Sequence, residues 1–106
     1  MSEFVTVAKV GAIAEGQGET FEIAERLVAV FLYEGAYFAI DDVCPHMGAS
    51  LGAGAVEEGV VTCPWHAWRF RLCDGTWQDS PKTKIDSFEV RVAGDEIQVR
   101  MNGAKT

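Results

Sequence analysis

Two short clusters of cysteine and histidine are the residues of this chain best suited to chemistry. The first cluster holds Cys44 and His46, and the second, after sixteen intervening residues, holds Cys63 and His66. Both histidines of the chain and two of its three cysteines fall in these clusters, and each cluster also contains a proline. Thiolates and imidazoles are ligands for soft and borderline metals. The pattern therefore predicts two loops that close on one metal centre.

The spacing within each cluster narrows the kind of metal centre. A cysteine and a histidine separated by one or two residues can hardly share one face of a helix, whereas a tight loop presents both. A zinc finger more often pairs two cysteines on one arm and two histidines on the other. Here each arm supplies one of each, which suits a two-metal cluster. Mononuclear zinc, and two proline-containing turns that bind no metal, stay open as alternatives.

At these residues the sequence resembles a known family. Cys44-Pro45-His46-Met47-Gly48 and Cys63-Pro64-Trp65-His66 are similar to the C-x-H and C-x-x-H motifs of Rieske-type ferredoxins, of the low-potential kind associated with oxygenases. The resemblance implies a [2Fe–2S] cluster in which two cysteines, Cys44 and Cys63, hold one iron and two histidines, His46 and His66, hold the other. It also implies an all-β fold, a Rieske-like antiparallel β-sandwich or open barrel with an inserted, loop-rich cluster-binding subdomain.

The rest of the sequence supplies strands that could position the two arms. Residues 27–33 are almost wholly apolar, as expected of a strand buried on both faces. Glu34-Gly35 and Asp74-Gly75 indicate tight hairpin turns. The glycines between the arms indicate a loop with one helical turn near residues 49–53, and residues 102–106 are expected to fray. Strands are predicted at residues 4–10, 20–23, 27–33, 36–40, 60–62, 68–72, 76–77, 88–92 and 96–100.

The length of 106 residues suits one domain with a modest core. Strands from both ends of the chain are expected to form the scaffold of this single domain, residues 1–106. Residues 41–80, which contain both arms, form the cluster-binding subdomain within it.

Charge and cysteine usage bear on partners and compartment. Residues 1–60 hold ten carboxylates against two basic side chains, whereas residues 61–106 hold six carboxylates against seven basic side chains. Nucleic acid is a poor partner for such a chain. The acidic half either faces a basic patch on a redox partner or serves only solubility. Cys73 is left unpaired, which fits a reducing compartment. We expect Cys73 itself to be a small core or turn residue. With no apolar run long enough for a membrane span and no signal peptide in view, we expect a cytoplasmic protein that does not bind membranes.

The resemblance also bears on the reduction potential. High-potential Rieske proteins of respiratory complexes carry an extra cysteine pair, and a serine and a tyrosine that donate hydrogen bonds to cluster sulfur. At the matching positions this sequence has Ala49 and Trp65 for the cysteines, and Trp68 and Phe70 for the hydroxyl donors. Fewer donors leave the reduced state less stabilised. We therefore predict a potential at the low end of the range of about −150 to +300 mV.

Several residues near the arms have two interpretations. Met47 and Trp65 form either an apolar rim on which a partner docks or a packing contact between the loops. Pro81 resembles the proline of a loop that covers such clusters, and is otherwise a turn proline. Trp77, like Phe70, is expected in the core.

We expect the chain to be a one-electron carrier, not an enzyme, that passes electrons from a flavin reductase to a terminal oxygenase. No histidine is left over for a mononuclear iron site of the kind that an oxygenase needs. Two alternatives remain: a small ferredoxin-like subunit of a larger reductase such as nitrite reductase, and a structural zinc domain.

Overall fold

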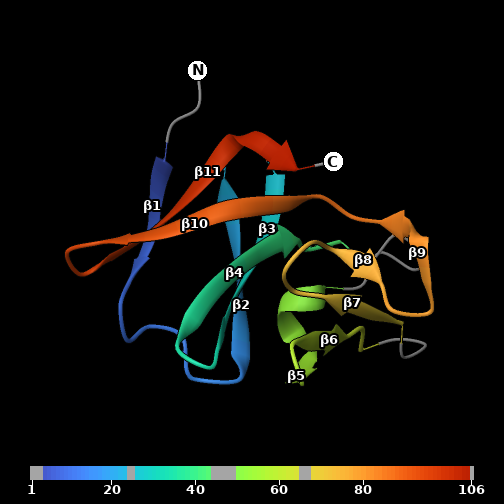
Figure 1. The fold of residues 1–106 in the computed structure, drawn as a ribbon. Helices are drawn as coiled ribbons and strands as arrows, with labels where there is room; N and C mark the ends of the chain where they lie inside the picture. The colour runs from blue at the N-terminus through green and yellow to red at the C-terminus, as the bar shows by residue number, and fades with distance from the viewer. Residues whose placement is uncertain (1–3, 24–25, 44–49, 65–67, 106) are drawn as a thin grey trace.

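Two antiparallel β-sheets make up the fold in a computed structural model of the chain (Figure 1). The structure describes residues 4–23, 26–43, 50–64 and 68–105. Within these ranges the larger sheet has six strands in the order β1-β11-β10-β4-β3-β2, and the smaller sheet has five in the order β5-β6-β7-β8-β9. The elements are β1 Phe4–Lys9, β2 Gln17–Ile23, β3 Arg26–Tyr33, β4 Ala36–Asp41, the 3₁₀ turn η1 Leu51–Ala53, β5 Ala55–Glu57, β6 Val60–Thr62, β7 Arg69–Arg71, β8 Thr76–Trp77, β9 Ser80–Lys84, β10 Ser87–Ala93 and β11 Glu96–Lys105.

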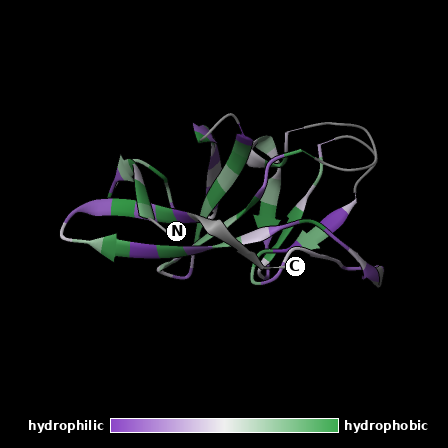
Figure 2. Ribbon diagram, turned by 90° about the horizontal axis from the view of Figure 1, so that it is seen from above, coloured by the Kyte–Doolittle hydropathy of each residue, from purple (hydrophilic) through white to green (hydrophobic). Residues whose placement is uncertain are grey.

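The larger sheet is built from both ends of the chain. The chain leaves it after β4, forms η1 and the smaller sheet, and returns at β10, which pairs with β4 through Ser87 with Ile40 and Phe88 with Ala39. The two edge strands, β1 and β2, line a common groove of about 270 Å³, so the sheet curls into an open barrel. Apolar and polar residues alternate along β10 and the first half of β11 (Figure 2). The predicted all-β class is confirmed.

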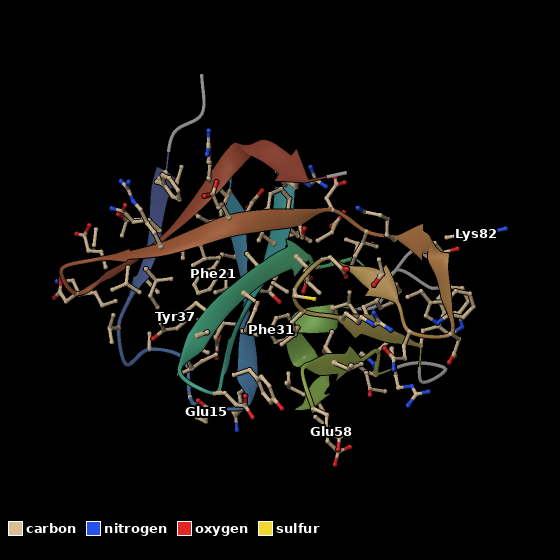
Figure 3. The ribbon with its side chains drawn as sticks, in the orientation of Figure 1. Glu15, Phe21, Phe31, Tyr37, Glu58 and Lys82 are labelled. Atoms are coloured by element: carbon tan, nitrogen blue, oxygen red, sulfur yellow. The ribbon has the colours of Figure 1, made fainter. Side chains whose placement is uncertain are left out.

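Strand β3 is buried on both faces, as its apolar sequence predicts. Val28 and Val30 belong to a core inside the curled sheet, where Phe21 and Tyr37 pack against them. Phe31 belongs, with Ala29, to a second core between the two sheets (Figure 3). One strand therefore links the barrel core to the core beneath the smaller sheet.

The turn between β3 and β4 forms as the sequence predicts. Glu34 has φ 51° and Gly35 has φ 78°, the positive values that a type I′ hairpin turn requires. The Glu15 carboxylate accepts hydrogen bonds from both backbone nitrogens, at 2.6 Å from Glu34 and 3.2 Å from Gly35. These contacts stabilise an otherwise uncommon conformation at Glu34.

The strands differ from the sequence prediction at several places, and Ala55–Glu57 forms a strand, β5, in a stretch expected to be a loop. Strand β2 begins at Gln17, before the predicted start at residue 20, and so includes Gly18, where the Phe31 ring covers the position that a side chain would take. Residues 80–84 form an additional strand, β9, which pairs with β8 at the edge of the smaller sheet. The expectation that residues 102–106 fray is wrong as far as Lys105, because β11 continues to Lys105 and pairs there with Ser87. The predicted helical turn near residues 49–53 is confirmed as η1.

Candidate metal centre

The first arm leaves the larger sheet at the end of β4, and its two ends meet. Val43 and Ser50 form an antiparallel bridge, and the Leu51 N–H donates to the Asp42 carbonyl at 2.7 Å. These contacts close the base of residues 44–49. Cys44 and His46 lie outside the described residues, as do Met47 and Ala49.

A buried carboxylate organises the base of this first arm. Asp42 is only 2% exposed. Its Oδ1 accepts hydrogen bonds from Thr20 Oγ1 at 2.9 Å, from Ser50 Oγ at 2.9 Å and from the Gly52 N–H at 2.8 Å. These donors come from β2, from the end of the arm and from η1, and three of them satisfy a buried carboxylate oxygen. Asp42 is not part of the ligand motif, and the sequence signal that could have revealed it is its place in an acidic pair between an apolar strand and the predicted ligand Cys44.

Two ion pairs of Arg26 tie the end of β4 to its surroundings. The Arg26 guanidinium bonds to Asp41 Oδ2 at 3.1 Å and also to Asp86 Oδ2. The hydrogen bond to Asp86 raises the pKa of Arg26 more than burial lowers it, and Asp41 raises it further. Arg26 thus links the start of β3, the end of β4 and the segment that leads into β10.

The second arm is closed in the same way as the first. The Cys63 N–H donates to the Trp68 carbonyl at 2.6 Å, across residues 64–67. The Cys63 side chain is 2% exposed and belongs to the core between the sheets, with Leu51 and Phe70. Cys63 is therefore the one predicted ligand that the described ranges contain; His66 and Trp65 lie outside them.

The two arm bases contact one another through a close backbone approach. Gly54 follows η1, and a side-chain carbon at this position would collide with the Thr62 carbonyl, next to Cys63. Leu51, which follows the first arm, packs in the same core as Cys63. The fold thus brings the end of the first predicted ligand arm beside the start of the second.

An aromatic group lies at the exit of the second arm. The rings of Trp68 and Trp77 stack with 4.0 Å between centroids and 12° between planes, and Trp68 lies 6.3 Å from Phe70 at 45°. Phe70 is fully buried, which confirms its predicted core position, and half-buried Trp77 packs against the same core. Pro81, expected in a loop or turn, lies in β9; proline is tolerated in such an edge strand.

These surroundings fit an iron–sulfur cluster. Two thiolates and two imidazoles are the donor set of a Rieske centre, and backbone pairing closes the base of each arm next to a strand. In the described ranges no three histidine, cysteine or acidic side chains gather as a metal site. The three remaining predicted ligands belong to residues 44–49 and 65–67, which fall outside those ranges.

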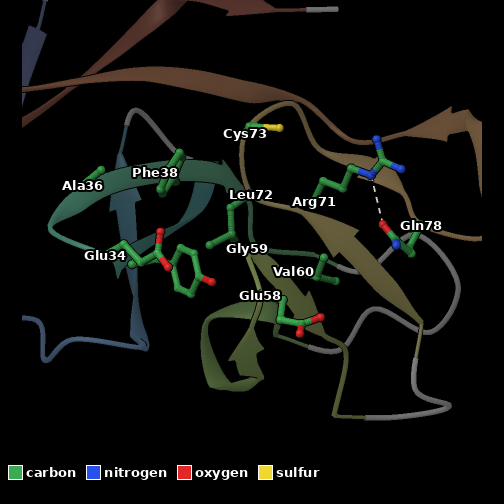
Figure 4. A pocket seen from close by; sticks show the side chains of 11 residues that line it. Glu34, Ala36, Phe38, Glu58, Gly59, Val60, Arg71, Leu72, Cys73 and Gln78 are labelled. Carbon is green, nitrogen blue, oxygen red and sulfur yellow. Dashed lines mark hydrogen bonds between the residues drawn. The ribbon is translucent and has the colours of Figure 1, made fainter.

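A separate groove of about 510 Å³ lies between the β3–β4 hairpin and the smaller sheet (Figure 4). Tyr33, Glu34 and Glu58 line one part of it, and burial, followed by the charge of the two carboxylates, raises the pKa of Tyr33. Arg71, hydrogen-bonded to Gln78 at 2.9 Å, lines another part. Cys73 also lines this groove, at an exposed turn position, which agrees with the predicted turn residue. No helix in the described part of the chain could span a bilayer.

Comparison with known proteins identifies the family. A model of the Rieske [2Fe–2S] domain matches residues 3–98. The ferredoxin component of the alkene monooxygenase system of Xanthobacter autotrophicus is 31% identical over 98 residues, which are 92% of this chain and 80% of that protein.

Solved structures agree with this match. The ferredoxin of carbazole 1,9a-dioxygenase from Nocardioides aromaticivorans gives a TM-score of 0.84 at 28% identity and covers 91% of this chain and 95% of its own. A protein named as an NADH-dependent nitrite reductase small subunit from Mycobacterium tuberculosis gives 0.88 at 26% identity and covers 95% and 96%. This chain therefore belongs to the Rieske [2Fe–2S] domain family, and its cofactor is a [2Fe–2S] cluster of the Rieske type.

Proposed function

We propose that this chain is a one-electron carrier and that Cys44, His46, Cys63 and His66 hold its cluster. The observation that carries the proposal is the pair of closed arm bases. Val43 with Ser50, and Cys63 with Trp68, end the two arms on hydrogen bonds, and Cys63 opens the second arm from the core between the sheets.

The donor set explains why such a chain suits electron transfer. When bound, the cluster supplies a site that accepts and releases single electrons. Neutral imidazoles at His46 and His66 replace two of the four thiolates of a plant-type centre, so the reduced form carries less negative charge. This raises the potential above that of plant-type ferredoxins, whose potentials lie near about −400 mV.

The partners follow from the same proposal. The chain takes electrons from a flavin reductase and delivers them to a terminal oxygenase. The names of the relatives support this route, since one is the ferredoxin component of an alkene monooxygenase system and another is the ferredoxin of a carbazole dioxygenase. The chain is itself an electron-transfer component and no oxygenase, because its two histidines serve as cluster ligands and none is left for a mononuclear iron site. Neither nucleic acid nor a membrane is a partner.

We propose that residues 1–106 form one Rieske-type domain, with residues 41–80 as the cluster-binding subdomain. We also propose that the chain resides in the cytoplasm. Cys73, an exposed free thiol, is compatible with such a reducing compartment.

The test begins with the freshly purified protein. We expect two irons and two sulfides per chain, a red-brown colour, and a Rieske-type EPR signal after reduction. Single substitutions of Cys44, His46, Cys63 and His66 by alanine should each abolish this signal, whereas Cys73→Ala should keep it. A colourless zinc protein, or an intact signal in any of the four ligand variants, would contradict the ligand assignment.

A second candidate is the small subunit of a larger reductase. The TM-score of 0.88 with the nitrite reductase small subunit favours it. Stable co-purification with a large reductase subunit would support this candidate. Rapid reduction of the isolated chain by a diffusible flavin reductase, followed by reoxidation by an oxygenase, would support the carrier.

A further inference from the structure

The indole nitrogen of Trp77 is a buried hydrogen-bond donor. Trp77 Nε1 is shielded from solvent and has no hydrogen-bond partner within the described structure. An indole nitrogen donates and cannot accept. A buried N–H without an acceptor is costly and rare in native proteins, so an acceptor for this donor is expected.

Contacts place this donor at the exit of the second arm. The Trp77 ring stacks on Trp68 with 4.0 Å between centroids, and the Trp68 carbonyl accepts the hydrogen bond from Cys63 that closes the arm. Trp77 also pairs directly with Phe70 across β7 and β8. Directly opposed residues share one face of a sheet, and on this face Phe70 packs in the same core as Cys63.

Two other buried polar atoms lack a partner in the part of the chain that the structure describes, Ser87 Oγ and Arg100 Nε. Both belong to the larger sheet, in β10 and β11. A serine hydroxyl rotates to suit its surroundings, and Arg100 already pairs with Glu89 through Nη1 at 2.7 Å. The stacked Trp77 ring has no such alternative.

We propose that Trp77 Nε1–H donates a hydrogen bond to a sulfur of the bound [2Fe–2S] cluster or of its cysteine ligands. This inference rests on the proposed function. Phe70 has no polar atom in its side chain, whereas the Trp77 Nε1–H, on the same face of the smaller sheet, is a hydrogen-bond donor. A donor to sulfur stabilises the negative charge that reduction adds. Trp77 thereby raises the reduction potential of this chain above the value that it would have without the donor.

The test compares Trp77→Phe with Trp68→Phe in the full-length, cluster-loaded protein. Trp77→Phe keeps an aromatic ring for the stack and removes the N–H, whereas Trp68→Phe alters the same stack and keeps the Trp77 N–H. At a fixed potential we expect Trp77→Phe to lower the ratio of reduced to oxidised protein about tenfold, equal to a midpoint about 59 mV lower for one electron. Trp68→Phe should change this ratio less than about threefold. A change below threefold in Trp77→Phe, or equal changes in both variants, would overturn the proposal.

A second measurement keeps the proposal testable if Trp77→Phe loses the cluster. Wild-type protein labelled with ¹⁵N in its indole rings is reduced and studied by pulsed EPR. We expect a ¹⁵N coupling that persists in labelled Trp65→Phe and Trp68→Phe proteins; its absence from these proteins overturns the proposal. A wild-type protein that binds no iron would instead contradict the proposed function, so the two failures are distinguishable.

Discussion

Ser50 donates a hydrogen bond to the buried carboxylate of Asp42 at 2.9 Å, and this contact ties together the two ends of the first arm. Asp42 comes just before residues 44–49 and Ser50 just after them. The same oxygen also accepts from Thr20 in β2 and from the Gly52 backbone in η1. One carboxylate therefore sets the position from which the predicted ligands Cys44 and His46 extend.

Asp42→Ala is expected to destabilise the protein and to weaken cluster retention. The substitution leaves the buried Gly52 N–H without an acceptor, at a cost of about 1–3 kcal/mol, and releases both hydroxyl donors. Asp42→Asn keeps an acceptor oxygen and should cost about 1 kcal/mol. Urea unfolding and the iron content after gel filtration measure both effects. Equal stability of the alanine variant and the wild type would show that the arm base does not depend on Asp42.

The strands that carry a local signal are those that the sequence predicts. The apolar run of β3, the Glu34-Gly35 turn and the alternation in β10 depend on neighbouring residues, and all three are observed. By contrast β9, with the sequence Ser-Pro-Lys-Thr-Lys, has no apolar alternation and is a strand because β8 pairs with it. The last part of β11 likewise depends on a distant pairing, that of Lys105 with Ser87.

In the candidate metal centre, too, features that depend on neighbouring residues can be predicted, whereas contacts between distant parts of the chain cannot. Residue types and spacing are enough to predict the donor set of Cys44, His46, Cys63 and His66 and its resemblance to a Rieske motif. They do not reveal that Thr20, from a strand remote in sequence, supports the first arm through Asp42, or that the Trp77 ring stacks on Trp68. Such supporting contacts form only when the two sheets pack together.

Gly54→Ala tests the close approach between the two arm bases. Gly54 has φ −81° and ψ 165°, values that alanine adopts readily, so any effect comes from the added methyl group. That group would collide with the Thr62 carbonyl next to Cys63. We expect a loss of about 1–3 kcal/mol and faster loss of iron. Ala53→Ser, at the exposed neighbouring position, should stay within about 0.5 kcal/mol of the wild type; similar losses in both variants would remove the steric explanation.

Asp74 is expected to make the stability of the smaller sheet sensitive to acid. Burial alone would raise the pKa of Asp74, but hydrogen bonds from the Thr76 N–H and hydroxyl, with the charges of Arg71 and Lys84, hold it below its usual value. Because the folded pKa is lowered, the stabilisation is present above the unfolded pKa of about 3.9 and is lost as the pH falls through the folded value. Asp74→Asn should cost about 0.5–1 kcal/mol at pH 7 and nothing at the lowest pH.

Urea unfolding of the wild type and Asp74→Asn between pH 7 and pH 3 measures this difference. Asp95→Asn is a matched control, since Asp95 is exposed. Among the ion pairs of the described residues, Asp95 takes part in one, with the exposed Lys9 at 3.5 Å. Its stability should stay parallel to that of the wild type over the whole range. A constant gap between Asp74→Asn and the wild type down to pH 3 would be inconsistent with a lowered pKa.

Phe70→Tyr is expected to raise the reduction potential from a wild-type value near the low end of the Rieske range, about −150 mV. The family resemblance implies that, in high-potential Rieske proteins, a tyrosine at this position donates a hydrogen bond to cluster sulfur. Phe70 is fully buried in the core that contains Cys63, so a hydroxyl added there has little access to water. Without an acceptor it would cost about 1–3 kcal/mol of stability, whereas a sulfur acceptor would offset that cost and stabilise the reduced state.

An EPR-monitored potentiometric titration should give a clearly higher midpoint for Phe70→Tyr than for Phe70→Leu, which removes the ring without adding a donor. Equal midpoints for the two variants would mean that position 70 does not reach the cluster, and a positive wild-type midpoint would rule out the low-potential assignment.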